Sequence, residues 1–358
     1  MDKIAIIRSI AAFFVAGILS FILSPVAKKI AHQIGAIDVP KDDRRMHKEP
    51  IPRLGGLAVF FAFLVAVILL VPIDLEMQGI LLGAVVIVVL GIIDDAVSLP
   101  AMLKLIVQII AALIVVLHGT RIDVLSNVNV FSDHAYLSLG MWSIPITVLW
   151  IVAITNAVNL IDGLDGLSVG VCTIASISLL IISVMVSEFT IVVIMAALAG
   201  ACIGFLPYNM NPAKMFVGDT GATFLGFILA TMSIQGMFKT YAILSFAAPF
   251  LVLGLPIFDT AFAICRRLLH GQSPMHADRG HIHHRLIDVG FNQKQTVLIL
   301  YLISGVLGMS AVLLTLSGAM RALLFVVTVL IAFIIGYRIY KTVHIAHKKK
   351  SDDEPSDN

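Results

Sequence analysis

The chain consists mostly of long apolar runs separated by short polar connections. A run of about twenty apolar residues is long enough to cross the hydrocarbon core of a bilayer as an α-helix. The sequence therefore predicts eleven spans, near residues 4–26, 55–73, 78–93, 102–118, 144–158, 167–187, 189–206, 221–238, 241–264, 296–317 and 320–340. Between the fourth and fifth spans, the alternating segment RIDVLSNVNVF predicts a short hairpin instead.

The composition leads to the same class. Hydrophobic residues make up 59% of the chain and charged residues only 13%, and the mean hydropathy is +1.02. These values lie far outside the range of soluble globular proteins. We expect an all-α polytopic membrane protein, with a single transmembrane domain over residues 1–345 and a charged, disordered tail over 346–358.

The distribution of Lys and Arg predicts the orientation. One set of alternate connections, together with the C-terminal tail, carries 19 of the 24 basic residues. Connections rich in Lys and Arg usually face the cytoplasm. The N-terminus is therefore predicted outside and the C-terminus inside, as an odd number of spans requires.

Five polar clusters interrupt the apolar pattern, and all five fall on the predicted cytoplasmic side. They are IDVPKDDRRMHKEPIPRLGG, GIIDDAVSLPAMLK, NAVNLIDGLDGL, FVGDTGATFLG and HADRGHIHHRL. A carboxylate at bilayer depth costs roughly 3 kcal/mol or more. The shared location is therefore best explained by one site that several loops assemble.

The residue types in these clusters suggest the ligand. Adjacent carboxylates and amide oxygens are hard ligands that suit Mg²⁺ or Mn²⁺. Lys104, Arg279, Arg285 and the pair Arg44 and Arg45 add cations that commonly bind phosphate. Together they predict a metal-assisted pyrophosphate site.

Local geometry makes two further predictions. On a straight helix, the four polar side chains of NAVNLIDGLDGL cannot converge, because each step of three residues rotates the side chain by about 60° backwards. Gly163 and Gly166 can end the helix and return Asp165 to a common pocket. Ser98 is expected to cap a helix that begins near Pro100.

Each cluster also has a purely structural interpretation. The acidic pair of GIIDDAV could be a solvated helix end paired with Lys104, and the asparagines of NAVN could join neighbouring helices. Asp219 could cap the eighth span. The histidines of HIHH could be solvated or could bind zinc. An ion-coupled transporter is an alternative function, although its carboxylates are expected near the midplane.

Four motifs, DDAVSLPAMLKLIVQ, NAVNLIDGLDGL, FVGDTGATFLG and HIHH, occur in an order that resembles the polyprenyl-phosphate N-acetylhexosamine-1-phosphate transferases. The resemblance extends from about Asp38 to Arg285. It implies Mg²⁺-dependent transfer of a sugar 1-phosphate from a UDP-sugar to a polyprenyl phosphate, with release of UMP. Mn²⁺ is a possible substitute for Mg²⁺.

The resemblance also implies a role for individual positions. Asp219 and Asn159 match metal ligands. The remaining catalytic positions are Asp94 and Asp95 near the lipid phosphate, Lys104 at the phosphates, Asp162 beside the metal, and His281, His283, His284 and Arg285 around the sugar and pyrophosphate. The expected substrate-binding positions are Asp38, Arg45, His47, Asn156, Asp165, which reads the uracil, and Arg279.

The histidine motif narrows the choice of donor substrate. The branch that uses UDP-muramyl-pentapeptide typically has three consecutive histidines and then an acidic residue, whereas Ile282 interrupts the run here and Arg285 follows it. The resemblance therefore implies UDP-N-acetylglucosamine and, in a bacterial cell membrane, undecaprenyl phosphate. It is greatest to the enzyme that starts wall teichoic acid linkage units. A homodimer is left open, and no nucleic-acid partner is expected.

Overall fold

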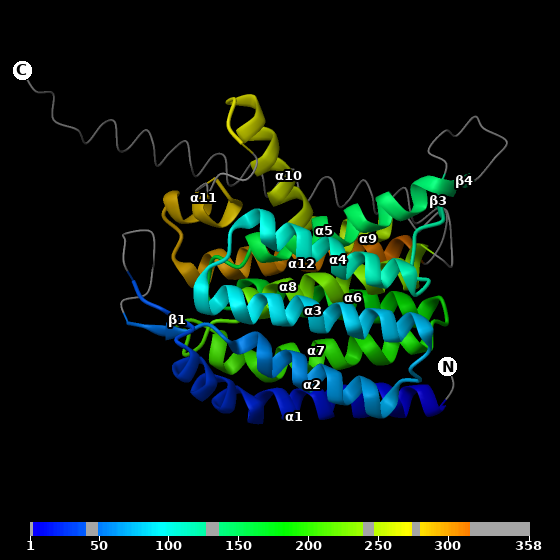
Figure 1. The fold of residues 1–358 in the computed structure, drawn as a ribbon, viewed down its shortest axis with the longest axis horizontal. Helices are drawn as coiled ribbons and strands as arrows, with labels where there is room; N and C mark the ends of the chain where they lie inside the picture. Colours follow the sequence, from blue (N-terminus) through cyan, green and yellow to red (C-terminus); the bar gives the residue numbers. More distant parts are fainter. Residues whose placement is uncertain (1–2, 41–48, 127–135, 239–246, 274–279, 316–358) are drawn as a thin grey trace, which may run out of the picture.

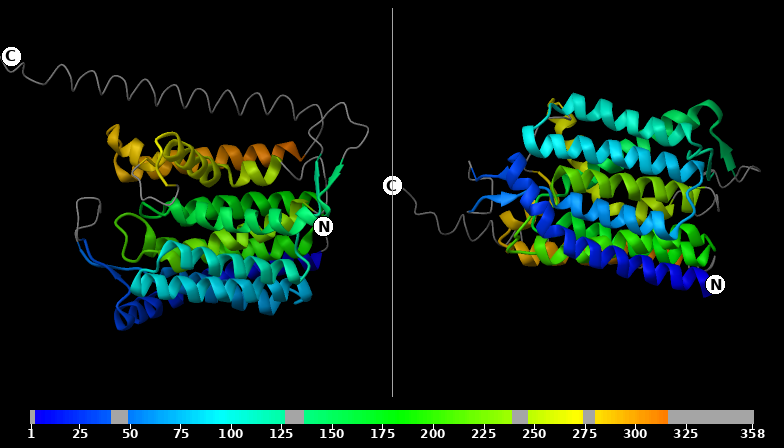
Figure 2. Two further views of the ribbon diagram at one scale, coloured as in Figure 1. Left: turned by 45° about the horizontal axis from the view of Figure 1, so that its top comes forward. Right: turned by 60° about the horizontal axis from the view of Figure 1, so that its bottom comes forward.

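The computed structural model describes residues 3–40, 49–126, 136–238, 247–273 and 280–315. Long helices run roughly parallel to one another through the molecule (Figures 1 and 2). The α-helices are α1 Lys3–Ile34, α2 Gly55–Leu70, α3 Leu75–Val97, α4 Ala101–Leu117, α5 Ser143–Leu160, α6 Leu167–Met185, α7 Phe189–Asn209, α8 Gly218–Ser233, α9 Ala247–Val252, α10 Gly254–Leu269, α11 Ile282–Asp288 and α12 Gln293–Leu314. A short 3₁₀ helix (Gly140–Trp142) precedes α5, and a π-helical turn, η2 (Ile234–Phe238), follows α8.

Six of these helical segments are long and apolar enough to cross a membrane, namely α1, α3, α5 with the turn before it, α6, α7 and α12. The helices α2 and α4 are apolar but shorter. Large apolar side chains such as Ile7, Leu69 and Leu117 are exposed on the outer surface, where lipid can cover them. The protein is therefore an all-α membrane protein, as predicted.

The first eight predicted spans coincide with α1 to α8, and the tenth coincides with α12. The expected ninth span over 241–264 is wrong as a single helix. Within it the structure describes α9 and α10, which are separated at Leu253, and α10 departs from the direction of the bundle (Figure 1). Pro256 lies in the first turn of α10, where its missing N–H costs nothing, so the helix can restart there.

The expected eleventh span and the predicted tail lie outside the described residues. The total of eleven spans and the division into a domain and a tail therefore stay predictions.

The two ends of the bundle carry different connections. The antiparallel pair of β1 (Ile37–Asp38) and β2 (Ile51–Pro52) lies at the same end as α11. The start of α1 and the pair of β3 (Val124–Ser126) and β4 (Tyr136–Ser138) lie at the other end (Figure 1). The predicted hairpin between the fourth and fifth spans is thus confirmed. Which end faces the cytoplasm stays a prediction.

The centre of the bundle is α8, in which every residue except Asp219 is buried. Glycines on its neighbours allow a very close approach. A Cβ atom on Gly91 of α3 would lie 2.3 Å from the Thr220 Cα, and one on Gly56 of α2 would lie 2.1 Å from the Gly221 nitrogen. The first turn of α8 is therefore held directly against the end of α3 and the start of α2.

Candidate active site

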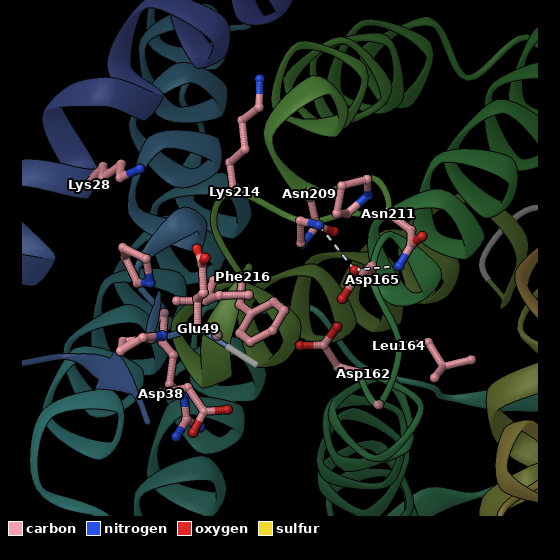
Figure 3. A pocket seen from close by; sticks show the side chains of 18 of the residues that line it. Lys28, Asp38, Glu49, Asp162, Leu164, Asp165, Asn209, Asn211, Lys214 and Phe216 are labelled. Carbon is pink, nitrogen blue, oxygen red and sulfur yellow. Dashed lines mark hydrogen bonds between the residues drawn. The ribbon is translucent and has the colours of Figure 1, made fainter. Parts of the chain in front are cut away.

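A cavity of about 920 Å³ opens at the end of the bundle that carries β1 and α11. Five of the predicted site residues line it, namely Asp38, Asp162, Asp165, Asp219 and His284. In Figure 3, Asp162 and Asp165 lie on the opposite side of the cavity from Asp38 and Glu49. The cavity therefore joins segments that are more than two hundred residues apart in the sequence, as the clustering of polar motifs predicted.

The turn between α5 and α6 places Asp162 and Asp165 in this cavity. Helix α5 ends at Leu160, and Gly166 has a φ of +79°, a conformation that glycine adopts readily. Asp165 Oδ2 accepts hydrogen bonds from Asn211 Nδ2 at 2.9 Å and from the Ala213 backbone N–H at 3.0 Å. The predicted glycine turn is confirmed, and it brings Asp165 to the same cavity as Asp162, but the two asparagines of the motif do not line this cavity.

Asp162 is the first of the two carboxylates on this turn. Burial raises the pKa of Asp162 to about 7, and the charges of Asp219 and Asp165 act in the same direction. The Ser168 hydroxyl, which donates to Asp162, and the Arg53 guanidinium oppose this rise in pKa. A cation that entered the cavity would favour the ionised form of Asp162.

The acidic pair at the end of α3 divides into two different environments. Asp94 accepts a hydrogen bond from Lys104 Nζ at 2.8 Å and another from the Leu99 backbone N–H at 2.6 Å. Lys104 Nζ also lies 3.3 Å from Asp219 Oδ2. The ammonium group of α4 therefore joins a carboxylate of α3 to one of α8.

Asp95 instead caps the start of α8. It accepts hydrogen bonds from the backbone N–H groups of Asp219 and Thr220 at 2.9 and 3.0 Å, and from Thr220 Oγ1 at 2.7 Å. Its side chain has no exposed surface. The alternative that Asp219 itself caps α8 is wrong, since the N-cap is Val217 without a side-chain hydrogen bond. The Asp219 carboxylate, 22% exposed, lies at the cavity instead.

Ser98 does not cap α4, contrary to the sequence prediction. Helix α4 begins at Ala101 with Pro100 as an N-cap that makes no side-chain hydrogen bond. Ser98 ends α3 in a left-handed conformation with a φ of +51°. The backbone N–H that follows, on Leu99, is bound by Asp94, so the carboxylate orders this connection.

The two asparagines of NAVN have different surroundings. Asn156 exchanges hydrogen bonds with Gln108 of α4, at 2.6 and 3.3 Å, and also donates to the Val152 carbonyl at 2.8 Å. It does not line the cavity, so the contacts of Asn156 fit the interhelical interpretation. Asn159 lies on the last turn of α5, before Asp162, and is not a lining residue either.

The histidine motif forms the start of α11. His281 Nδ1 lies 2.8 Å from Asp259 Oδ2, and the Ile282 backbone N–H donates to Asp259 Oδ1 at 2.7 Å. His283 is buried against Gly163, and neither ring nitrogen has a hydrogen-bond partner within the described part of the chain. Burial lowers the pKa of His283 to about 3, and His284 contributes, so the ring is neutral near pH 7.

Arg285 lies apart from the cavity. Its guanidinium carbon is 4.6 Å from the centre of the Phe262 ring on α10, and the side chain is exposed. Three further predicted residues, Arg45, His47 and Arg279, lie outside the described residues.

Comparison with known proteins identifies the family. A sequence profile described as glycosyl transferase family 4 matches residues 77–237. A Bacillus subtilis protein named "Probable undecaprenyl-phosphate N-acetylglucosaminyl 1-phosphate transferase" is 39% identical over 328 residues, which cover 91% of this chain and 90% of that protein. The chain belongs to glycosyl transferase family 4.

Two further relatives carry related names. A decaprenyl-phosphate N-acetylglucosaminephosphotransferase of Mycobacterium tuberculosis is 33% identical over 324 residues, or 83% of this chain and 80% of that protein. A phospho-N-acetylmuramoyl-pentapeptide-transferase of Clostridium beijerinckii is 28% identical over 305 residues, or 81% of this chain and 91% of that protein. The profile match itself runs from α3 to η2, so it excludes α1, α11 and α12.

Arg53 is a cavity residue of this family 4 chain that the sequence prediction missed. Its Nε lies 3.7 Å from Asp95 Oδ1, and its side chain lines the cavity. Burial alone would lower the pKa of Arg53, but Asp95, Asp219 and other carboxylates outweigh it and leave the pKa above its ordinary value. The available signal was its place between two prolines and two glycines, in PIPRLGG, directly before a span.

The acidic side chains fit a magnesium ion that is shared with a substrate. In the described ranges, no three His, Cys, Asp or Glu side chains are grouped so as to hold a metal. Mg²⁺ in phosphate-transferring sites usually takes only one or two carboxylates, together with waters and substrate phosphates. The partly exposed carboxylate of Asp219 at the cavity meets this requirement. A zinc site built only from protein ligands is not supported there.

Proposed function

We propose that this protein transfers N-acetylglucosamine 1-phosphate from UDP-N-acetylglucosamine to undecaprenyl phosphate, producing undecaprenyl-diphospho-N-acetylglucosamine and UMP. The observation that carries this proposal is the meeting of Asp219, Arg53 and the Asp162–Asp165 turn at one open cavity, with the Lys104 ammonium bound to Asp219. The names of the relatives from Bacillus subtilis and Mycobacterium tuberculosis support the same transfer and acceptor class.

The proposed reaction is a direct displacement at phosphorus. An oxygen of the lipid phosphate attacks the β-phosphorus of the UDP-sugar, the bond from that phosphorus to the bridging oxygen breaks, and UMP leaves. Asp219 would hold the Mg²⁺ ion at the cavity, and the resemblance of the motifs implies Asn159, on the last turn of α5, as a second ligand. When bound, Mg²⁺ would neutralise charge on the diphosphate.

The protein side chains would position the two phosphates. The Lys104 ammonium lies between Asp94 and Asp219, where it can bind phosphate oxygens of the acceptor or donor. Arg53 adds a second cation, whose Nε lies 3.7 Å from Asp95 Oδ1. Asp165 would bind the uracil with the carboxylate oxygen that Asn211 does not occupy. Such pre-positioning lowers the entropic cost of bringing donor and acceptor together.

The location of the cavity suits a reaction between a soluble and a lipid substrate. The cavity opens at one end of a bundle of apolar helices, so a nucleotide-sugar can enter from water while an isoprenoid chain stays in the bilayer. We propose that this end faces the cytoplasm, since 19 of the 24 Lys and Arg residues lie in the connections predicted there. The resulting cellular location is the bacterial cell membrane.

The product would be the first lipid-linked intermediate of a cell-envelope glycan. We assign it to the wall teichoic acid linkage unit because of the resemblance of the four motifs. The transporter alternative has no supporting observation in the described part of the chain, where the carboxylates of the site lie at one end of the bundle and not at its midplane.

Purified protein, undecaprenyl phosphate, Mg²⁺ and a panel of UDP-sugars test the proposal through UMP release. We expect release with UDP-N-acetylglucosamine. Asp219→Ala and Asp94→Ala should remain inserted in the membrane yet lose transfer of labelled sugar phosphate. Release with UDP-muramyl-pentapeptide but not with UDP-N-acetylglucosamine would overturn the proposed donor, and full Mg²⁺-dependent activity of Asp219→Ala would overturn the metal assignment.

A further inference from the structure

Helix α12 contacts the turn that carries Asp162 and Asp165. The Tyr301 hydroxyl on α12 donates a hydrogen bond to the Gly166 carbonyl oxygen at 2.5 Å. Gly166 ends this turn in a left-handed conformation and is the N-cap of α6. The bond therefore joins α12 to the backbone of the turn itself, at the residue that directly follows Asp165.

The Tyr301 side chain packs directly against the backbone of Gly170 on α6. A Cβ atom on Gly170 would lie 2.0 Å from both the Tyr301 hydroxyl oxygen and the ring carbon Cζ. Any larger residue at position 170 would therefore push the tyrosine ring away from the turn. Gly170 lies one helical turn after Gly166, and its lack of a side chain lets the hydroxyl group reach the Gly166 carbonyl.

A second residue of α12 reaches the same turn through a side chain. Gln293 Oε1 accepts a hydrogen bond from Asn211 Nδ2 at 2.7 Å, and the same Asn211 nitrogen donates to Asp165 Oδ2 at 2.9 Å. Gln293 is the first residue of α12, and a capping box between Asn292 and Gln295 fixes where this helix begins. The capping box thereby places Gln293 opposite Asn211.

We propose that Tyr301 and Gln293 are positioning residues for the donor nucleotide, because they hold the Asp162–Asp165 turn in its binding geometry from two sides. The inference rests on the proposed function, in which Asp165 binds the uracil. Tyr301 acts on the turn through the Gly166 carbonyl, and Gln293, which lines the cavity, acts on it through Asn211. Both residues lie outside the segment that the family profile matches. Replacing either residue should weaken binding of the donor more than binding of the lipid acceptor.

The Tyr301→Phe variant removes one hydroxyl group and little else. A hydrogen bond of this kind contributes about 1 kcal/mol, which corresponds to about a fivefold change in affinity. We expect the donor KM to rise about fivefold, while kcat and the acceptor KM stay within about twofold. Gln293→Leu should raise the donor KM in the same way. Tyr208→Phe on α7 is the matched control, since the structure records no hydrogen bond from that hydroxyl to another described residue.

Hydrogen–deuterium exchange of the full protein supplies a readout that needs no substrate. Backbone exchange over residues 163–170 should be faster in Tyr301→Phe and Gln293→Leu than in wild type and Tyr208→Phe. Unchanged exchange there in both variants overturns the inference, and so does an unchanged donor KM in an active enzyme. If the wild type releases no UMP from UDP-N-acetylglucosamine, the proposed function fails, while the exchange data still decide whether α12 holds the turn.

Discussion

The two ends of α3 carry similar acidic residues in very different surroundings. At the start of the helix, Asp74 accepts a hydrogen bond from the Met77 backbone N–H at 2.8 Å and acts as the N-cap. Glu76 accepts one from Gln235 at 2.8 Å, and Gln235 also donates to Thr120. The Glu76 contact joins α3 to its neighbours, and neither acidic residue lines the cavity described above.

At the other end of α3, the acidic pair serves a different purpose. Asp95 accepts hydrogen bonds from the first turn of α8. Asp94 and Asp219 both bind the Lys104 ammonium, and the Asp219 carboxylate also lines the cavity. A carboxylate at a helix end is therefore not by itself evidence of a functional site. The evidence is the convergence of several segments and of unlike charges on one cavity.

The largest expected difference is between Asp94→Asn and Asp74→Asn. Asp94→Asn should lower kcat/KM by about 10²-fold or more, because it removes the charge that holds Lys104 at the phosphates. Asp74→Asn should keep activity within about twofold, because asparagine is as good an N-cap as aspartate. UMP release by equal amounts of purified protein measures both. Equal losses in the two variants would remove the contrast between the ends of α3.

Asp95→Ala should act mainly by lowering the stability of the fold. The change leaves two buried backbone N–H groups and the Thr220 hydroxyl without their acceptor. We expect a loss of about 2 kcal/mol in the free energy of unfolding. Glu76→Ala at the opposite end should cost less than about 1 kcal/mol. Thermal unfolding in detergent gives the order, and a larger drop for Glu76→Ala would contradict it.

The buried His283 ring should make the stability of the protein depend on pH. Its folded pKa of about 3 lies below its ordinary value near 6.5 because burial disfavours the charged ring. As the pH falls below 6.5, the unfolded chain takes up a proton that the folded protein does not, so stability is lost. Between pH 7 and pH 5 this loss should be roughly 1 to 2 kcal/mol, and His283→Asn should remove it. Parallel pH profiles of unfolding midpoint for wild type and variant would disprove the neutral buried ring.

The smallest effect is expected at the amide pair away from the cavity. Gln108→Ala leaves the Asn156 side chain without its partner on α4 and should cost about 1 kcal/mol of stability. Replacing both residues by leucine should recover most of this loss. Gln108→Ala should also disturb Lys104 slightly, because Lys104 lies one turn earlier on the same helix. We therefore expect kcat/KM to fall, but by less than about tenfold. A loss comparable with that of Asp94→Asn would give Asn156 the direct substrate role that its contacts do not support.

Much of the site could be predicted because its polar residues stand out against lipid-facing runs. Asp162, Asp165 and Asp219 interrupt apolar sequence, and two glycines beside them signalled the turn that brings the first two together. The role of Asn156 was left by the sequence between substrate binding and pairing with a neighbouring helix. It differs from that of Asn159 because Gln108 on another helix pairs with it, and a pairing between helices leaves no local pattern.

Other features depended on contacts that the sequence does not encode locally. Ser98 had the right residue type for a cap, but Asp94 reached the backbone of this connection instead. The ninth span had enough apolar residues for one helix, yet the chain restarts at α10 beside Pro256. Arg53 lines the cavity from the segment before α2, and Tyr301 on α12 contacts the turn between α5 and α6, so neither position could be assigned from the local sequence.

We propose that acidic side chains meet around a divalent cation at this end of the bundle and not at the other. Electron paramagnetic resonance of Mn²⁺ bound to purified protein, in the presence of UDP-N-acetylglucosamine, tests it most directly. Wild type and Asp74→Asn should bind Mn²⁺ alike, whereas Asp219→Asn should bind it at least about tenfold more weakly. Equally tight Mn²⁺ binding by Asp219→Asn and wild type would contradict the claim.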